Sequence, residues 1–300
     1  MISMPVSPIT GGETVLIKKI PTDELVAMYR DKLDIDVRDH FSNLQFVELR
    51  ECRDTQYRFF YPFSVSGRET LYSQLQEQDW FYKHEKWEYS IAAGWICREE
   101  KILDIGCGVG NFLELATSKG ADAVGLEFNP SAVQEGQKKG RVIHQESIEN
   151  FALSNFEAFD LVVSFQVLEH VTDIKSFVSS ALSCLKRGGK FIVGVPNNAG
   201  FLRLDEAAPL NLPPHHMGLW EATSLRKLAD VFNMSIDRIE YEPLAETKWF
   251  QAVLEQRFLP KGIKAFLYHK LGGAEITSRA IESIAPSIHG HTVLVSFVKV

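Results

Sequence analysis

Apolar and polar positions change their spacing several times along the chain, and the most regular part lies between Lys101 and Pro196. There, short runs of apolar residues alternate with stretches in which apolar residues recur at helical spacing. The apolar runs predict strands at residues 101–106, 121–127, 141–145, 159–165 and 189–196. The helical stretches between them cover residues 111–120, 130–140 and 173–189. This alternation is typical of β-α-β units, and it predicts a doubly wound α/β fold with helices on both faces of a mostly parallel sheet.

The C-terminal third continues with a predicted helix and two further strands. Residues 221–232 have helical spacing, whereas residues 235–241 and 291–300 have the β-branched and apolar composition of strands. About 50 residues separate these two strands, and their spacing is largely helical. A bare loop of that length is uncommon in a compact domain. We therefore predict a helical insertion at about 244–285, directly before the last strand.

The N-terminal part has a different pattern. A helix is predicted at residues 22–33, and two β-rich runs on either side of the polar sequence RDTQ predict a hairpin. Residues 68–96 place aromatic and aliphatic side chains at helical spacing, including Leu71, Tyr72, Leu75, Trp80, Phe81, Trp87 and Ile91. These side chains either pack in the core or, in part, face a substrate over the mouth of the next domain. We predict an α+β appendage at 1–84, acting as a substrate-side cap, and a main domain at 85–300.

Composition and charge narrow the function. The net charge of −7 argues against a nucleic-acid backbone as the main partner. The first residues lack the pattern of a signal peptide, and no apolar run approaches the roughly 20 residues that span a bilayer. The cysteines are far apart, which fits free thiols in a reducing compartment and predicts a cytoplasmic protein.

The sequence KILDIGCGVGNF, residues 101–112, carries the strongest chemical signal. Glycines that follow a strand and precede a helix allow close backbone contact with a ligand, often a phosphate. Asp104, however, would repel a phosphate, and Glu127 ends the next strand where a carboxylate can accept both ribose hydroxyls. A nucleoside with a cationic amino-acid tail satisfies both carboxylates, and S-adenosylmethionine is such a molecule.

The motifs ILDIGCGVGNF, VGLEFNP, FDLVVSFQVLEHV and LKRGGKFIVGVPN resemble, in order and spacing, those of class I S-adenosylmethionine-dependent methyltransferases. The resemblance covers about residues 85–240. It implies a Rossmann-like sheet of seven strands, the last antiparallel and inserted beside the fifth. The two late strands would then supply strands six and seven.

The resemblance also implies roles for individual residues. Asp104, Gly106, Gly108 and Gly110 resemble the loop that holds the methionine end, and Cys107 is expected to be a small residue of that loop. Glu127 resembles the ribose acceptor, and Phe128 is expected to pack on the adenine. The remaining assignments are Glu146 and Ser147 at the adenine amino edge, and Gln166 facing the methionine or the transferred methyl group.

Methyl transfer to an alcohol or carbon acceptor needs a base, and histidine suits this role near neutral pH. The sequence NLPPHHMGLW, residues 211–220, follows the fifth strand and places His215 and His216 on the cofactor side of the sheet. His216 is the preferred base or substrate-binding group, with His215 second. Alternatively, both only hydrogen-bond their loop. Metal ligation is a third option, since adjacent residues can both bind one ion, but no metal is expected because no cysteine or acidic residue nearby has ligand spacing. Glu169 and His170 are expected to orient the loop after the fourth strand.

The front part of the chain resembles bacterial methyltransferases associated with sugar or cell-surface polysaccharide modification. Related sugar enzymes carry a zinc-binding cysteine pattern there, but Thr55 stands where the partner of Cys52 would be, so no zinc site is expected. We predict methyl transfer to a small-molecule or glycosyl-type acceptor, linked to polysaccharide biosynthesis. One alternative is O-methylation of a quinone or lipid-like ring, with the basic amphipathic residues 258–271 on a membrane surface. A nicotinamide-dependent oxidoreductase and a catalytically inactive cofactor-binding protein are the others.

Overall fold

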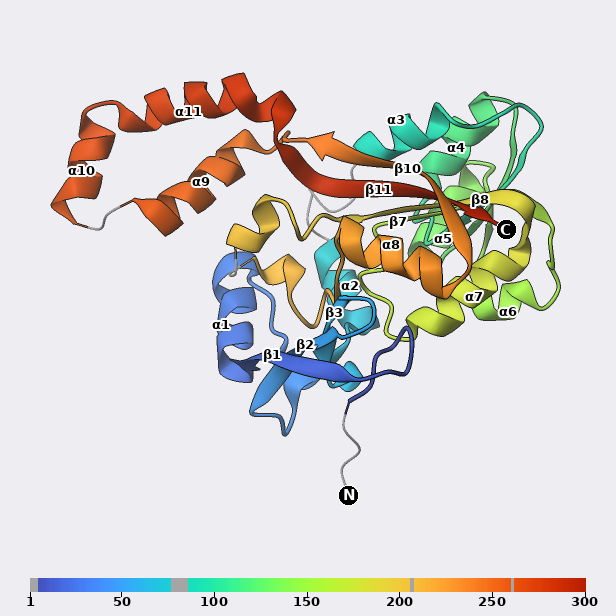
Figure 1. Ribbon diagram of the computed structural model, residues 1–300, viewed down its shortest axis with the longest axis horizontal. Coiled ribbons are helices and arrows are strands. Elements are labelled where there is room, and N and C mark those ends of the chain that lie inside the picture. The colour runs from blue at the N-terminus through green and yellow to red at the C-terminus, as the bar shows by residue number, and fades with distance from the viewer. Residues whose placement is uncertain (1–4, 77–85, 206–207, 260–261) are drawn as a thin grey trace.

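The computed structural model describes residues 5–76, 86–205, 208–259 and 262–300 and contains two sheets. The larger sheet has seven strands in the order β10-β11-β8-β7-β4-β5-β6 (Figure 1). In chain order these are β4 (Lys101–Ile105), β5 (Asp122–Leu126), β6 (Val142–His144), β7 (Phe159–Phe165), β8 (Leu185–Pro196), β10 (Met234–Pro243) and β11 (His289–Lys299). Strand β11 is antiparallel to both neighbours, whereas β4 to β8 are parallel. The predicted seven-stranded doubly wound sheet is confirmed, including the antiparallel last strand beside the fifth.

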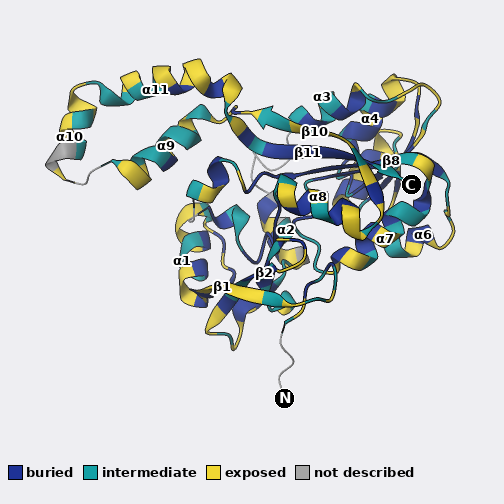
Figure 2. Cartoon of the chain, in the orientation of Figure 1, coloured by how far each residue is buried: buried dark blue, intermediate teal, exposed yellow. Residues whose placement is uncertain are grey.

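Helices cover both faces of this sheet. Side chains of α3 (Trp87–Ala93), α4 (Asn111–Ser118) and α5 (Pro130–Lys138) belong to the hydrophobic cluster on one face. Side chains of α6 (Ile148–Ala152), α7 (Ile174–Cys184) and α8 (Ala222–Val231) belong to the cluster on the other. The inner strands β4, β5, β7, β8 and β11 are largely buried (Figure 2), as expected for a parallel sheet covered on both faces.

One predicted boundary was wrong. Residues 173–189 were expected to be helical, but α7 ends at Cys184 and β8 begins at the next residue. The paired glycines at 188 and 189 lie inside the long strand, where Lys190 already pairs with Leu161 of β7. Tertiary pairing with β7 therefore overrides the helical spacing of the last residues in this segment.

The N-terminal part forms a second sheet, in the order β1-β2-β3-β9. Its elements are β1 (Thr14–Pro21), α1 (Thr22–Leu33), η1 (Arg38–Phe41), β2 (Phe46–Cys52), β3 (Arg58–Tyr61), η2 (Phe63–Val65) and α2 (Glu69–Gln76). The helix and hairpin were predicted, but the edge strand β1 was not. Its exposed Val15, Leu16 and Ile17 run directly into two lysines, so the alternation that marks a half-buried strand is absent.

The fourth strand of this sheet comes from a distant part of the chain. Strand β9 (Gly218–Leu219) follows the histidine loop and pairs with β3. It is preceded by η3 (Phe201–Leu204) and η4 (Pro209–Asn211). The N-terminal sheet is therefore tied to the segment that carries His215 and His216.

The helical insertion comprises α9 (Thr247–Phe258), α10 (Ile263–Lys270) and α11 (Gly273–Ile284), followed by η5 (Ala285–Ser287). It projects away from the large sheet as an arm (Figure 1). Its exposed residues include Phe258, Leu271 and Ile276. No helix within the described residues is both long and apolar enough to cross a bilayer.

Candidate active site

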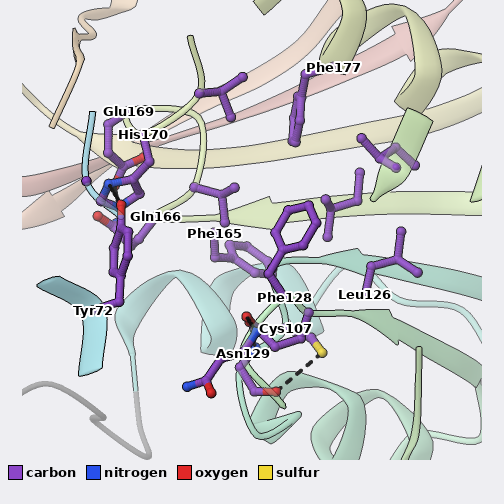
Figure 3. Close-up of a pocket in the computed structure, with 18 of the residues that line it drawn as sticks. Tyr72, Cys107, Leu126, Phe128, Asn129, Phe165, Gln166, Glu169, His170 and Phe177 are labelled. Atoms are coloured by element: carbon purple, nitrogen blue, oxygen red, sulfur yellow. Dashed lines mark hydrogen bonds and ion pairs between the residues drawn. The ribbon is translucent and has the colours of Figure 1, made fainter. Parts of the chain in front are cut away.

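A cavity of about 940 Å³ lies at the carboxyl ends of β4, β5 and β7. Its wall includes the glycine loop after β4, Glu127 after β5 and Gln166 after β7. Figure 3 shows Phe128, Asn129 and Cys107 together on one side of this cavity, with Tyr72, Gln166, Glu169 and His170 gathered on another. Ligands of open α/β sheets bind at this edge, so the site lies where the fold predicts it.

The glycine loop is fixed to the end of the neighbouring strand. The amides of Gly106 and Cys107 both donate to the carbonyl of Leu126, at 2.8 and 3.0 Å. Gly106 has a φ of 75°, and a Cβ atom there would lie 2.4 Å from Cγ2 of Val167. The loop therefore requires glycine for its backbone conformation and for its close approach to the loop after β7.

Glu127 is held by two backbone amides. Its Oε2 accepts from Gly108 at 2.9 Å, and its Oε1 accepts from Asn129 at 2.8 Å. Each carboxylate oxygen has a further lone pair, so Glu127 can also accept hydroxyl donors from a ligand. The carboxylate lines the cavity. It both anchors the glycine loop and presents negative charge where a ribose was predicted.

Asp104 is buried in β4, with only 1% of its surface exposed, and it does not reach the cavity wall. Its Oδ2 has no hydrogen-bond partner within the described residues. Burial raises the pKa of this carboxyl to about 7, nearby Lys86 lowers it, and Glu127 raises it further. The structure therefore places Asp104 off the cavity wall, so an attraction to a ligand ammonium group would act over a distance rather than by direct contact.

Of the residues predicted to bind the adenine, some line the cavity and others do not. Phe128 is 70% exposed and lines the cavity, as Glu146 does. Ser147, in contrast, lies off the wall because its hydroxyl caps α6 by accepting from the amide of Asn150. Gly110 also lies off the wall, as the N-cap residue of α4.

Gln166 and Cys107 both line the cavity. Gln166 follows β7 with a φ of 57°, and its side-chain amide donates to Glu88 at 3.2 Å. A glutamine held in this backbone region at a strand end marks stored strain. Burial raises the pKa of the Cys107 thiol well above its ordinary value, so the group remains a neutral thiol.

The structure brings His215 and His216 to the same cavity and places His170 beside them. The ring centroid of His170 lies 4.7 Å from that of His215 and 4.9 Å from that of His216. The two adjacent histidines stack on each other at 4.6 Å. The hydroxyl of Tyr72 lies 3.2 Å from Nδ1 of His170. Of the aromatic residues left open by the sequence, Tyr72 therefore faces the cavity, whereas Trp80 and Phe81 lie outside the described residues.

Burial controls the charge of this histidine cluster, defined here as His170, His215 and His216. It lowers the pKa of His170 to about 4 and that of His215 to about 3, and it lowers the pKa of His216 well below its ordinary value. Glu169 shows the opposite shift, because burial raises its pKa to about 8. Desolvation disfavours the charged form in every case, so the cluster is a neutral set of imidazoles at neutral pH.

Sequence reasoning missed two features of this site. Lys86 lines the cavity and lies near the buried carboxyls of Asp104 and Glu169. A basic residue directly before the first helix of the main domain was the available signal. The approach of His170 to His215 had no such signal, since 45 residues separate them in sequence.

The sheet order, the glycine loop and the carboxylate at the end of β5 define a class I methyltransferase fold. A family model described as a methyltransferase domain matches residues 82–238, which is more than half of the chain. The chain therefore belongs to this methyltransferase family, whose methyl donor is S-adenosylmethionine.

Known proteins agree with this assignment. The chain is 29% identical over 175 residues to a "Probable S-adenosylmethionine-dependent methyltransferase" of Mycolicibacterium smegmatis, a match covering 58% of this chain and 66% of that protein. It is 28% identical over 167 residues to a ubiquinone biosynthesis O-methyltransferase of Aliivibrio fischeri, covering 49% of this chain and 70% of the relative. The chain thus spans about two thirds of the length of these relatives.

The fold is also shared with a solved S-adenosylmethionine-dependent methyltransferase from Archaeoglobus fulgidus. The TM-score is 0.50 at 19% sequence identity, over 78% of this chain and 95% of that protein. The family match favours the methyltransferase prediction over the nicotinamide-dependent alternative.

Proposed function

We propose that the protein transfers a methyl group from S-adenosylmethionine to a hydroxyl group of a small-molecule acceptor. The observation that carries this proposal is that one cavity joins Glu127 and the glycine loop to the histidine cluster. Its volume of about 940 Å³ lies near the top of the ~300–1,000 Å³ range of ligand sites, which suits a cofactor and an acceptor together.

The residues at the first end fit the cofactor. Glu127 offers two oxygens already aligned by backbone amides, and the glycine loop allows close approach of the ligand. Asp104 lies behind the wall with an unpartnered Oδ2, and it adds negative charge there when its carboxyl is ionised. When bound, S-adenosylmethionine supplies a methyl group that is already activated by its positive sulfur. The remaining work of the protein is to align the acceptor and exclude water.

The histidine cluster would receive the acceptor hydroxyl. Nδ1 of His216 lies 3.3 Å from Oδ1 of Asn211, and an amide oxygen has no proton to give, so Nδ1 carries the hydrogen. Nε2 of His216 is then the ring nitrogen that can accept a hydrogen bond or a proton. Tyr72 and Leu210 extend the same wall and would orient the acceptor.

Two acceptor classes follow from separate observations. The resemblance of the N-terminal part to sugar-modifying enzymes favours a glycosyl hydroxyl. The similarity to ubiquinone biosynthesis O-methyltransferases favours a ring hydroxyl as the second candidate. We also propose a cytoplasmic location, supported by the free thiols of Cys52, Cys97, Cys107 and Cys184.

Calorimetry with S-adenosylhomocysteine and, separately, with NAD tests the cofactor assignment. We expect binding of the first and none of the second; tight binding of NAD alone would refute the proposal. Incubation with labelled methyl donor and two acceptor panels, nucleoside-diphosphate sugars and dihydroxybenzenes, then tests the chemistry. We expect label in one panel and its loss in His216→Asn, with S-adenosylhomocysteine affinity unchanged. Equal turnover in that variant would remove the assigned role of His216.

A further inference from the structure

The histidine cluster has the geometry of a metal site as well as that of an acceptor site. One ring nitrogen of each of His170, His215 and His216 lies within 4.8 Å of the other two. The cluster is assembled from two loops, one after β7 and one before β9. His215 and His216 are each only 7% exposed. Linear spacing gave no metal signal because the third imidazole comes from elsewhere in the chain.

The hydrogen bonds behind the rings fix their tautomers. Nδ1 of His170 lies 2.7 Å from the carbonyl oxygen of His215, and Nδ1 of His215 lies 2.9 Å from that of Leu210. Carbonyl oxygens only accept, so both rings carry their hydrogen on Nδ1 and their lone pair on Nε2. Histidines that bind metals almost always donate their second ring nitrogen to a carbonyl or carboxylate in this way.

The tautomer of His216 follows from a chain of amides. The side-chain amide of Asn198 donates to the carbonyl of Pro196 at 3.2 Å, which directs Oδ1 of Asn198 toward Asn211. Asn211 donates to that oxygen at 2.8 Å and so turns its own Oδ1 toward His216. His216 therefore also carries its hydrogen on Nδ1. All three imidazoles have Nε2 as the basic nitrogen.

Glu169 lies beside the cluster and can supply negative charge once a bound cation displaces its proton. Its side chain is 1% exposed and lines the same cavity, and its Oε2 has no hydrogen-bond partner within the described residues. Its Oε1 lies 3.9 Å from Nε2 of His170, which is too far for a hydrogen bond. Buried polar atoms nearly always have a hydrogen-bond partner, so this oxygen is available to interact with a bound ligand.

Hydrogen bonds already hold the backbone around these side chains in place. The carbonyl of Glu169 accepts from the amides of Met217 and Gly218, at 2.8 and 2.9 Å, and so joins the two loops. The hydroxyl of Tyr29, which belongs to the N-terminal part, donates to the carbonyl of Leu212 at 2.9 Å. A site held in this way keeps its donors close without a bound ion, which is the pre-organisation that ligand sites need.

We propose that His170, His215 and His216 together bind one divalent first-row transition metal ion, with the carboxyl of Glu169 beside them. Imidazole nitrogens with one carboxylate suit zinc, iron, cobalt or nickel, whereas magnesium and calcium prefer oxygen ligands. With metal–nitrogen distances of about 2.0–2.1 Å, tetrahedral donors lie roughly 3.4 Å apart. The imidazoles would therefore draw together by about an ångström on binding.

The ion would lie at the end of the cavity assigned to the acceptor. Its charge would lower the pKa of a bound hydroxyl and favour loss of the proton to solvent. This consequence rests on the proposed function and deepens it, because the histidines would then act through the ion. Binding of the ion itself does not depend on methyl transfer.

Titration of the chelator-treated protein with Co²⁺ tests the site directly. We expect one ion per chain, with visible absorption bands typical of imidazole ligation, and competition by Zn²⁺. Asparagine can keep the Nδ1-type donor while it removes Nε2, so His170→Asn and His216→Asn are the sharpest variants. Substituting the hydrogen-bond partners of metal ligands typically weakens metal binding ~10–100-fold. Each of these variants removes a ligand itself and should weaken Co²⁺ binding by at least that factor. Glu169→Gln, which retains shape and loses charge, should do the same.

The matched control is His269→Asn, because this histidine is exposed on the arm. It should leave Co²⁺ binding unchanged. Binding of S-adenosylhomocysteine, measured on every variant, shows that the fold and the cofactor end are intact. Failure to bind Co²⁺ and Zn²⁺ alongside normal S-adenosylhomocysteine binding would overturn the metal site and leave the proposed function standing.

Two further outcomes would also overturn the metal site. The first is Co²⁺ binding that survives His170→Asn, His216→Asn and Glu169→Gln alike, since the ion would then lie elsewhere. The second is full methyl transfer by metal-free protein that His216→Asn abolishes, since this would make His216 a direct base. Ion binding at the cluster without methyl transfer to either acceptor panel would instead support the site and count against the proposed function.

Discussion

Replacing Glu127 by alanine perturbs the cofactor end at its best-defined point. The side chain accepts from the amides of Gly108 and Asn129 at 2.9 and 2.8 Å. Its removal would release the middle of the glycine loop and delete the predicted acceptor of the ribose hydroxyls. Both effects weaken cofactor binding, and neither requires a change elsewhere in the sheet.

The size of the effect follows from the bonds involved. Hydrogen bonds to a charged group contribute about 1.5–3 kcal/mol each, but water replaces part of this in an open cavity. We expect Glu127→Ala to weaken S-adenosylhomocysteine binding by about 1–3 kcal/mol, which is roughly a 5- to 150-fold higher Kd. Glu127→Gln should lie close to the alanine variant, because one of its two ends would present an amide donor to a backbone donor.

Isothermal calorimetry measures this directly, and thermal unfolding of the free protein reports loss of the loop anchor separately. Asp122→Ala is the matched control, since Asp122 is an exposed carboxylate at the opposite end of the same strand, β5. It should leave the Kd unchanged. A Kd for Glu127→Ala within twofold of the unaltered protein would refute the assignment of this carboxylate to the cofactor.

Three further changes probe the loop, the histidine support and the buried charge. Gly106→Ala places a Cβ atom 2.4 Å from Val167 at a φ of 75°, so it should lower the melting temperature and S-adenosylhomocysteine affinity together; unchanged values would contradict the steric reasoning. Tyr29→Phe leaves the carbonyl of Leu212 without its donor and should destabilise the fold by about 1–3 kcal/mol, with turnover reduced and cofactor affinity retained. Burial raises the pKa of Asp104 to about 7, so its carboxylate is protonated as the pH falls below that value. Affinity for S-adenosylhomocysteine, whose amino-acid tail carries an ammonium group, should therefore fall from pH 7.5 to 6. Asp104→Asn should flatten this dependence, measured by calorimetry, and an equally steep curve in that variant would assign the titration to another group.

The sequence by itself determined the large sheet and the strand ends that meet at its edge. Strands β4, β5 and β7 are predominantly apolar, and each ends at the residue before a candidate ligand group. The carboxyl ends of parallel strands meet at one edge, which is why residues as distant as Gly106, Glu127 and Gln166 could be assigned to one cavity. All three line it.

Only the tertiary structure decided the boundary of β8, the edge strand β1 and the composition of the acceptor end. His170 meets His215 and His216 because the carbonyl of Glu169 bonds the amides of Met217 and Gly218 across two loops. Loops carry no periodic pattern, and contacts between them depend on the packing of every element that positions their ends. The physical reason is that the periodic burial of a strand or helix depends on residues that are neighbours in sequence. A cluster assembled from separate loops, in contrast, exists only after the chain has folded.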